Sequence, residues 1–429
     1  MGHDTLTAVL TSVVAKGLGF FKEVMVAASF GLSGALDIYV MAFVLIGFPL
    51  SVLLNAVQTA LIATLASCDR SSPDEGRRLF TGTALITLAS LIVLLPIWLL
   101  LLLHALPWLA SGFPMEKRQG LETALLWLIP YYFLNGFNLL GYGVLQAKGR
   151  YLINGLLPSA TPIATIFVLL VWSASGDWRT LATALVFGSA IECTFLLIAM
   201  HRSGQILPPR FRNVARLKTV VGNALALLPG TIMLAVGPVV EQAISASLGE
   251  GTNAALGYGF KLPAALQGIL VTAVGITALP YFASLIGQNR VAYCLHSLDR
   301  MASGLFAGGL LLAIPLAIFS ADIVELFYQR GAFDAAATAR VGPIQLAYFA
   351  QLPFALVAML GVKALAAIGR NGLLSFFTIV AVLFQCALAY GLGLRFGAEG
   401  IAWAATLVSA LLAAASYLTA RSSLQQLFT

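Results

Sequence analysis

The stretch Thr11–Phe43, TSVVAKGLGFFKEVMVAASFGLSGALDIYVMAF, is mostly apolar, yet it contains two lysines and two acids. Its apolar length predicts one membrane-spanning helix, a tight hairpin turn and the start of a second helix. The four charged residues are Lys16, Lys22, Glu23 and Asp37. A charge at bilayer depth costs about 2.5–3.5 kcal/mol on insertion scales, so we expect these side chains to face a wet cavity or to pair with one another.

The composition of the whole chain is that of a membrane protein. Of 429 residues, 60% are hydrophobic and 10% are charged, whereas about 25% are charged in a typical soluble protein. Continuous apolar runs recur from end to end, which predicts an all-α polytopic fold rather than a β-barrel. The first apolar segment contains lysines and has no small-residue cleavage site, so we expect no cleavable signal peptide.

Two further features of the composition exclude function classes. The four cysteines are scattered without metal or redox spacing, so we expect isolated thiols and no metal site. The net charge of +7 is better explained by basic cytoplasmic loops than by nucleic-acid binding.

The apolar runs divide into segments that are long enough to cross a bilayer. We predict twelve transmembrane helices, at 6–30, 36–66, 80–110, 121–146, 151–174, 179–201, 217–247, 253–285, 299–321, 338–367, 372–393 and 397–419. Most basic loop residues fall on the same side as both chain ends, which predicts that both termini are cytoplasmic.

An internal repeat predicts how these helices are organised. The stretches Leu139–Arg150 (LLGYGVLQAKGR) and Met359–Arg370 (MLGVKALAAIGR) share six residues at one offset, and both end a predicted span. A looser similarity joins the stretches that start at Asn55 and Thr272. The offset equals six helices, so both halves should enter the membrane in the same sense. Parallel repeats of this kind form two lobes with the transport pathway between them.

The repeat predicts two pseudo-symmetric six-helix lobes, residues 1–205 and 206–429. The boundary should fall in the basic polar loop His201–Lys218.

Three embedded lysines point to an anionic substrate. Lys16 and Lys22 lie in the first span, and Lys261 follows Gly257 and Gly259 in a helix-weakening context. One interpretation is a cationic cavity in which ammonium groups contact phosphate. The alternative is that the lysines snorkel to the interface or pair with acids.

The embedded acids leave alternatives open. Asp37 could pair with Lys22 across the hairpin, or could lie in the headgroup region. Glu241 and Gln242 could bind Na⁺ or take up a proton, or Glu241 could neutralise Lys261. Glu192 has no evident partner in the sequence.

Several motifs resemble those of a known family. They are LGFFKEVMVAASFG with LDIYVMAF in the first two spans, GYGFKLPAALQGILVTAVGITALPYFASL in the eighth, and LFYQRGAFDAAAT after the ninth. Together they resemble the MurJ/MviN family, the lipid II flippases of the multidrug/oligosaccharidyl-lipid/polysaccharide exporter superfamily.

The resemblance implies roles for particular residues. Lys22 and Glu23 stand where the family has Arg-Asp, and Asp37 matches its acid at the start of the second span. Lys261 stands where the eighth span has a cavity arginine, and Glu241 falls near an acid of a proposed sodium site. The implied substrate is a polyprenyl-diphosphate-linked sugar.

The resemblance also implies a setting in the cell. It is the bacterial cytoplasmic membrane, with cell-envelope synthesis enzymes as possible partners and no cofactor beyond a coupling Na⁺ or H⁺.

The chain departs from the family pattern in ways that keep other functions open. Apolar sequence near Leu50 and Ser51 replaces an arginine pair, lysine replaces the cavity arginines, and the family's last two helices have no counterpart. An exopolysaccharide precursor is therefore an alternative to lipid II. The rival functions are a drug/cation antiporter of the same superfamily, a membrane transferase and a non-transporting envelope-synthesis scaffold.

Overall fold

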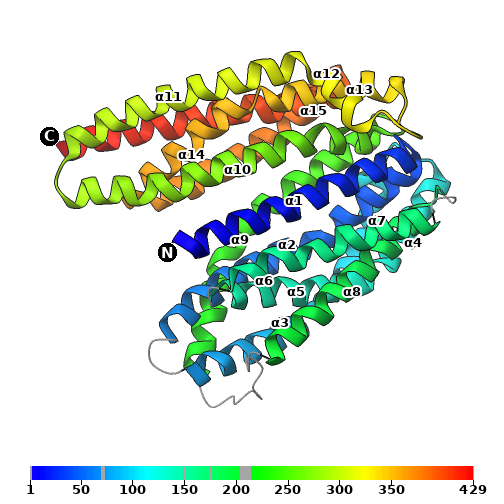
Figure 1. Ribbon diagram of the computed structural model, residues 1–429, viewed down its shortest axis with the longest axis horizontal. Coiled ribbons are helices and arrows are strands. Elements are labelled where there is room, and N and C mark those ends of the chain that lie inside the picture. The colour runs from blue at the N-terminus through cyan, green and yellow to red at the C-terminus, as the bar shows by residue number, and fades with distance from the viewer. Residues whose placement is uncertain (1, 69–72, 148–149, 173–175, 203–213, 429) are drawn as a thin grey trace. The chain divides into compact units, whose positions relative to one another are not determined.

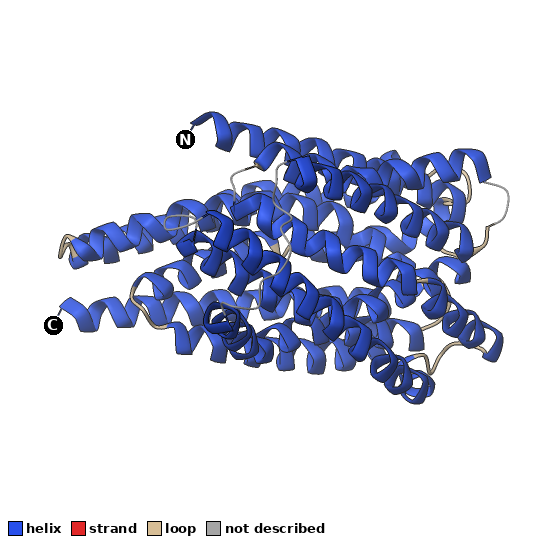
Figure 2. Ribbon diagram, turned by 90° about the horizontal axis from the view of Figure 1, so that it is seen from below, coloured by secondary structure: helices blue, strands red, loops and turns tan. Residues whose placement is uncertain are grey.

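The computed structural model describes residues 2–68, 73–147, 150–172, 176–202 and 214–428. Within these ranges the secondary structure consists of helices and connecting turns, without a strand (Figure 2). The chain divides into two compact units, Met1–Gln242 and Ala243–Thr429.

Among the described residues, the first unit contains ten elements, some of them short. Its elements are α1 (Gly2–Phe30), α2 (Gly34–Cys68), α3 (Pro73–Leu109), α4 (Met115–Trp127), α5 (Ile129–Ala147), α6 (Tyr151–Leu156), the 3₁₀ turn η1 (Leu157–Ser159), α7 (Ala160–Trp172), α8 (Trp178–Arg202) and most of α9 (Val214–Ser247).

The second unit contains four long elements and two short helices. They are α10 (Thr252–Gly287), α11 (Val291–Ile318), α12 (Ser320–Tyr328), α13 (Ala335–Phe349), α14 (Leu352–Ala367) and α15 (Asn371–Phe428). The helices α10, α11, α14 and α15 lie side by side (Figure 1).

Each predicted span falls on a described helix, on a broken helix or on one half of α15. The span at 121–146 is the pair α4 and α5, which meet at an angle of 46°. The span at 151–174 is interrupted at η1, where Pro158 cannot donate a helix hydrogen bond. The last two spans form α15, which breaks at Gly397 with φ 64° and ψ −146°.

Length and composition alone identify fewer spans. Eight helices in the described residues are long and apolar enough to cross a membrane, or nine when α4 and α5 count as one. Two reasons for the difference are that α15 counts once and that the apolar helix Leu157–Trp172 is short. The prediction of an all-helical, multi-pass membrane fold is confirmed.

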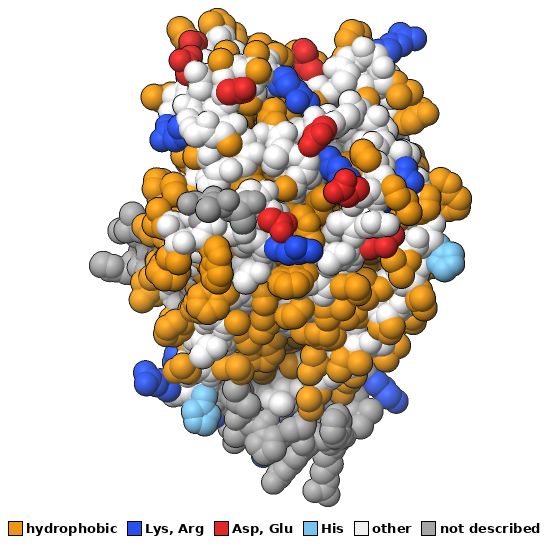
Figure 3. Space-filling view, turned by 90° about the vertical axis from the view of Figure 1, so that its right-hand side faces the viewer, with side chains coloured by type: hydrophobic (Ala, Val, Ile, Leu, Met, Phe, Trp, Pro, Cys, Tyr) orange, Lys and Arg blue, Asp and Glu red, His pale blue; other side chains and the backbone are white. Residues whose placement is uncertain are grey.

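The surface of these helices suits a lipid environment. Large hydrophobic side chains are exposed along α3, including Ile92, Val93, Leu100 and Leu101. Figure 3 shows a broad area of hydrophobic side chains on the face it draws. In water such an area would mark an interface, and in a bilayer it contacts lipid tails.

The turn between α12 and α13 explains the QRGAFD sequence at 329–334. Gly331 takes φ 60°, a backbone conformation that favours glycine. The turn then buries the Phe333 ring against the rings of Tyr258 and Tyr328. Asp334 starts α13, and its carboxylate accepts a hydrogen bond from the Ala337 N–H at 2.8 Å.

The predicted lobe boundary at 205/206 lies outside the described residues, which resume at 214. The structural division falls within α9, between Gln242 and Ala243. The six-plus-six division based on the repeat therefore stays a prediction, as does the pathway between the lobes.

Candidate functional site

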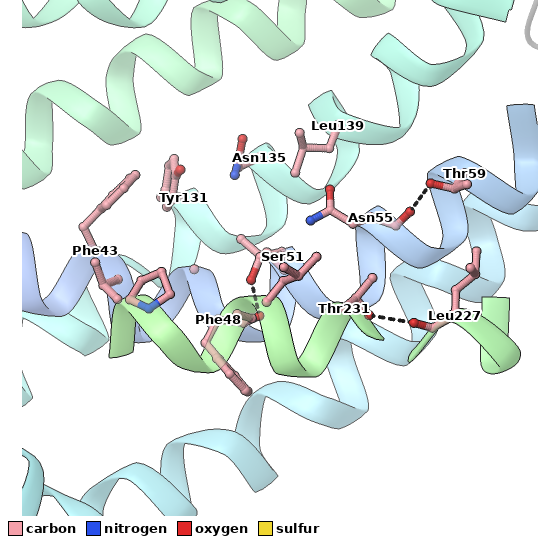
Figure 4. Close-up of a pocket in the computed structure, with 16 residues that line it drawn as sticks. Phe43, Phe48, Ser51, Asn55, Thr59, Tyr131, Asn135, Leu139, Leu227 and Thr231 are labelled. Carbon is pink, nitrogen blue, oxygen red and sulfur yellow. Dashed lines mark hydrogen bonds between the residues drawn. The ribbon is translucent and has the colours of Figure 1, made fainter. Parts of the chain in front are cut away.

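The first unit contains a cavity of about 680 Å³ between α2, α5 and α9 (Figure 4). Helical periodicity builds it, because residues four apart share one face of a helix. Its lining is drawn from such faces: Phe43, Gly47, Ser51, Asn55 and Thr59 on α2, Tyr131, Asn135 and Leu139 on α5, and Leu227, Thr231, Leu234, Ala235 and Pro238 on α9, with Val44, Phe48 and Leu50 beside them.

Two amide side chains are the main hydrogen-bonding groups of this cavity. Asn55 and Asn135 approach it from α2 and α5 (Figure 4). Neither side chain has a hydrogen-bond partner among the described residues. The hydroxyls of Ser51 and Thr231 are already used, since each donates to a carbonyl of its own helix at 2.8 Å and 3.0 Å. The two amides are therefore available to hydrogen-bond a polar ligand.

Aromatic rings and the absence of charge define the rest of the cavity. The ring of Phe43 lies 5.7 Å from that of Tyr131, and the ring of Phe48 stacks on Trp98 at 4.8 Å. No charged side chain is among the sixteen residues that line this cavity. Aromatic faces together with neutral amides can hold an uncharged polar molecule, such as a sugar ring, better than an ion.

The two predicted cationic residues of α1, Lys16 and Lys22, have different surroundings. The Lys22 ammonium lies 2.6 Å from the Glu23 carboxylate, and both side chains are partly buried. Lys16 lies on an exposed part of α1. Neither lysine lines the cavity, so their role in substrate binding stays a prediction.

The structure gives Asp37 a partner that the sequence analysis did not name. Its carboxylate is fully buried and lies 2.8 Å from the ammonium of Lys117 on α4. Lys117 also lies 4.2 Å from the ring centroid of Phe113. The sequence analysis did not foresee this ion pair, because Lys117 is 80 residues away from Asp37 in the sequence. Pairing of Asp37 with Lys22 and a position in the headgroup region both stay predictions.

The remaining predicted residues are divided between the two units. Glu241 and Gln242 are half-buried near the end of α9. Lys261 is exposed in the third turn of α10, in the second unit. A pairing of Glu241 with Lys261 would cross from one unit to the other, and it stays a prediction, as does cation coupling at Glu241.

The sequence analysis missed the amide pair and Lys117. A signal for the amides was present, because Ser51, Asn55 and Thr59 recur every four residues within an apolar span. No comparable local signal joins Lys117 to Asp37.

Comparison with known sequences places the chain in a family. The family model described as "Lipid II flippase MurJ" matches residues 26–429. A Synechocystis sp. protein described as a probable lipid II flippase MurJ is 27% identical over 373 residues, which cover 79% of this chain and 66% of the relative. A Rhizobium tropici protein with the same description is 26% identical and is covered to 65%. The chain thus spans slightly less than two thirds of these relatives' length.

Solved structures share the fold. A lipid II flippase MurJ in an inward closed conformation superposes with a TM-score of 0.76 at 19% identity, covering 99% of this chain and 92% of that one. An inward-facing multidrug resistance MATE family transporter of the MOP superfamily superposes with a TM-score of 0.73 at 14% identity. The superposition covers 96% of this chain and 94% of that transporter. Since the family model matches nearly the whole sequence, the chain belongs to the MurJ family of multi-pass membrane proteins.

Proposed function

We propose that this protein is a flippase, a transporter that moves a polyprenyl-diphosphate-linked sugar from the cytoplasmic to the outer leaflet of the bacterial cytoplasmic membrane. The family match over residues 26–429 carries this proposal. The substrate is lipid II, a peptidoglycan precursor, or a related oligosaccharide precursor. Both termini are cytoplasmic, and envelope-synthesis enzymes supply the substrate and use the product.

Two chemically different sites would serve the two parts of such a substrate. Lys16, Lys22 and Lys261 provide ammonium groups for the diphosphate, with Glu23 and Asp37 shaping the local field. The cavity of α2, α5 and α9 provides Asn55 and Asn135 for sugar hydroxyl and amide groups. Because that cavity is neutral, it suits the saccharide rather than the diphosphate.

Transport would follow alternating access, in which one half of the protein rocks against the other around a fixed site. Glu241 and Gln242 are the residues proposed to couple this change to Na⁺ or H⁺. The membrane potential would add about 2.3 kcal/mol per 100 mV for each charge moved.

The neutral cavity argues against the drug/cation antiporter. A site for a cationic drug needs a carboxylate to replace water around the charge. None of the lining residues is acidic.

Reconstitution into liposomes tests the proposal. Wild-type protein should expose a labelled polyprenyl-diphosphate sugar from the inner leaflet to an external enzyme. Substituting Lys16→Gln, Lys22→Gln or Lys261→Gln removes one charged hydrogen-bond donor each, so each should slow this exposure by about 10- to 100-fold. Lys218→Gln, an exposed lysine of α9, is the matched control and should leave the rate unchanged. If no headgroup crosses with or without an ion gradient, the protein is not a flippase.

A further inference from the structure

A second polar site lies within the first unit, away from the cavity described above. Glu192 on α8 is 7% exposed. Its carboxylate accepts a hydrogen bond from the hydroxyl of Tyr142 on α5, and another from the hydroxyl of Thr161 on α7 at 2.8 Å. Three helices therefore supply one buried acid and two hydroxyl groups.

Two glycines allow the helices α5, α7 and α8 to pack closely near Glu192. Gly188 lies one turn before Glu192, and a Cβ added to it would lie 2.6 Å from the Cα of Thr161. Gly141 is next to Tyr142, and a Cβ there would lie 2.5 Å from the side chain of Leu196, one turn after Glu192. Such close approach of helices at small residues is how membrane helices bring polar groups together.

The site lies deep in the membrane-spanning region. Glu192 is ten residues before Arg202, the last residue of α8, which corresponds to about 15 Å along the helix axis. That is about half of a hydrocarbon core of roughly 30 Å. A carboxylate at this depth costs several kcal/mol unless it is paired or neutralised.

No cation among the described residues pairs with Glu192. Its contacts are the hydroxyls of Tyr142 and Thr161, and α7 contains no charged or titratable side chain. The titratable groups on which the Glu192 carboxylate acts electrostatically are Tyr142 and Tyr131 of α5 and Cys193 of α8. On α2 and α4, which also contact α8, Asp37 and Lys117 pair with each other.

Further polar atoms around Glu192 lack partners. The amide nitrogen of Asn138, one turn before Tyr142, donates to the carbonyl of Ser189 at 3.3 Å, while its Oδ1 is buried without a hydrogen bond. The hydroxyl of Ser159, two residues before Thr161, is also buried without one. Buried polar atoms are normally satisfied, so this region has hydrogen-bonding capacity that no group among the described residues fills.

We propose that Glu192 is a proton-binding site that exchanges its proton with the medium through the hydroxyls of Tyr142 and Thr161. Protonation removes the uncompensated charge. Both hydroxyls can donate to the carboxylate and accept from the carboxylic acid, so each protonation state has partners. Both residues are half-buried, which leaves them within reach of the surface. Glu192 is a single carboxylate among neutral groups, and the described residues contain no group of three or more His, Cys, Asp or Glu side chains that could hold a metal ion.

Infrared difference spectroscopy of the full-length protein in nanodiscs tests this site without any transport substrate. Raising the pH should remove a protonated-carboxyl C=O band from the wild type. Glu192→Gln should lack this band, whereas Glu241→Gln, which alters another embedded acid, should keep it. In Tyr142→Phe the band should persist to more alkaline pH, because the carboxylate loses a donor.

Two results would overturn the proposal. One is a pH-dependent band that is unchanged in Glu192→Gln. The other is a wild-type band that disappears on adding Na⁺ at constant pH, which would assign the site to a metal cation. If Glu192→Gln does not fold, Thr161→Val replaces it in the comparison. This variant should shift the protonated-carboxyl band of the wild type, and an unchanged band would contradict the proposed site. None of these readouts depends on flippase activity.

Discussion

At the scale of single residues, the ion pair of Asp37 and Lys117 fixes α4 to α2. Asp37 is fully buried and the two charged groups are 2.8 Å apart. Removing one member of a buried pair typically costs about 3–5 kcal/mol, whereas replacing both by apolar or neutral groups is often tolerated. We therefore expect Lys117→Met to lower the thermal midpoint of the purified protein strongly, and Asp37→Asn combined with Lys117→Met to recover most of the loss.

The exposed pair of Arg179 and Asp177 is the control for this prediction. Its charged groups are 3.4 Å apart, and the arginine side chain is 58% exposed. Arg179→Met should change the free energy of unfolding by no more than about 1 kcal/mol. If Lys117→Met and Arg179→Met lowered the free energy of unfolding equally, burial would not explain how much the Asp37–Lys117 ion pair contributes to stability.

The amides of the neutral cavity provide a second prediction at this scale. Asn55→Leu and Asn135→Leu keep approximate side-chain volume but remove the groups that would bind sugar. Each should reduce flipping of a labelled lipid-linked sugar by about three- to tenfold, the value of one neutral hydrogen bond. Thr123→Val, at an exposed hydroxyl on α4 that donates to its own helix, should have no effect. Unchanged flipping in both asparagine variants would exclude this cavity from substrate binding.

At the scale of helices, small residues decide which pairs can pack closely. At Gly188 an added Cβ would lie 2.6 Å from the backbone Cα of Thr161. Because the Cα belongs to the backbone, no side-chain rotation can relieve this contact. Gly188→Ala should separate α7 from α8 and destabilise the protein by about 1–3 kcal/mol. Gly222→Ala on α9, where an added Cβ meets nothing within 4 Å, should be neutral or slightly stabilising. Thermal unfolding of both variants measures the difference.

The break in α15 depends on backbone conformation rather than on space. Gly397 has φ 64° and ψ −146°, yet an added Cβ there would meet nothing within 4 Å. Gly397→Ala should thus cost about 1–3 kcal/mol of backbone strain alone. Gly391→Ala, in the helix interior with the same open surroundings, should not lower the thermal midpoint. A stable Gly397→Ala variant would mean that the two halves of α15 can adopt another bend.

At the scale of the whole molecule, the distribution of basic residues predicts orientation. Alkaline phosphatase fused after Gly112, in the turn between α3 and α4, should be active because that turn is predicted to be outside. The same fusion after Gln288, before the basic start of α11, should be inactive, and a fluorescent protein at the C-terminus should fluoresce in the cytoplasm. The opposite pattern would invert the topology and the proposed direction of transport.

The sequence by itself determined the fold class and the approximate position of the helices. Apolar runs of sufficient length can satisfy their backbone only as helices in a bilayer, and this constraint acts locally along the chain. The separate spans predicted at 372–393 and 397–419 also agree with the division of α15 at Gly397. Motifs such as RGAF then indicated the family, which the match over residues 26–429 established.

Which polar side chains come into contact is known only from the tertiary structure. Asp37 joined Lys117 across 80 residues, Glu192 joined Tyr142 and Thr161 across 50 and 31, and Asn55 and Asn135 came to one cavity from separate helices. The physical reason is that a membrane helix presents its polar residues at a known spacing but not toward a known neighbour. Close packing at residues such as Gly188 and Gly141 selects that neighbour, and this selection depends on contacts that no local pattern records.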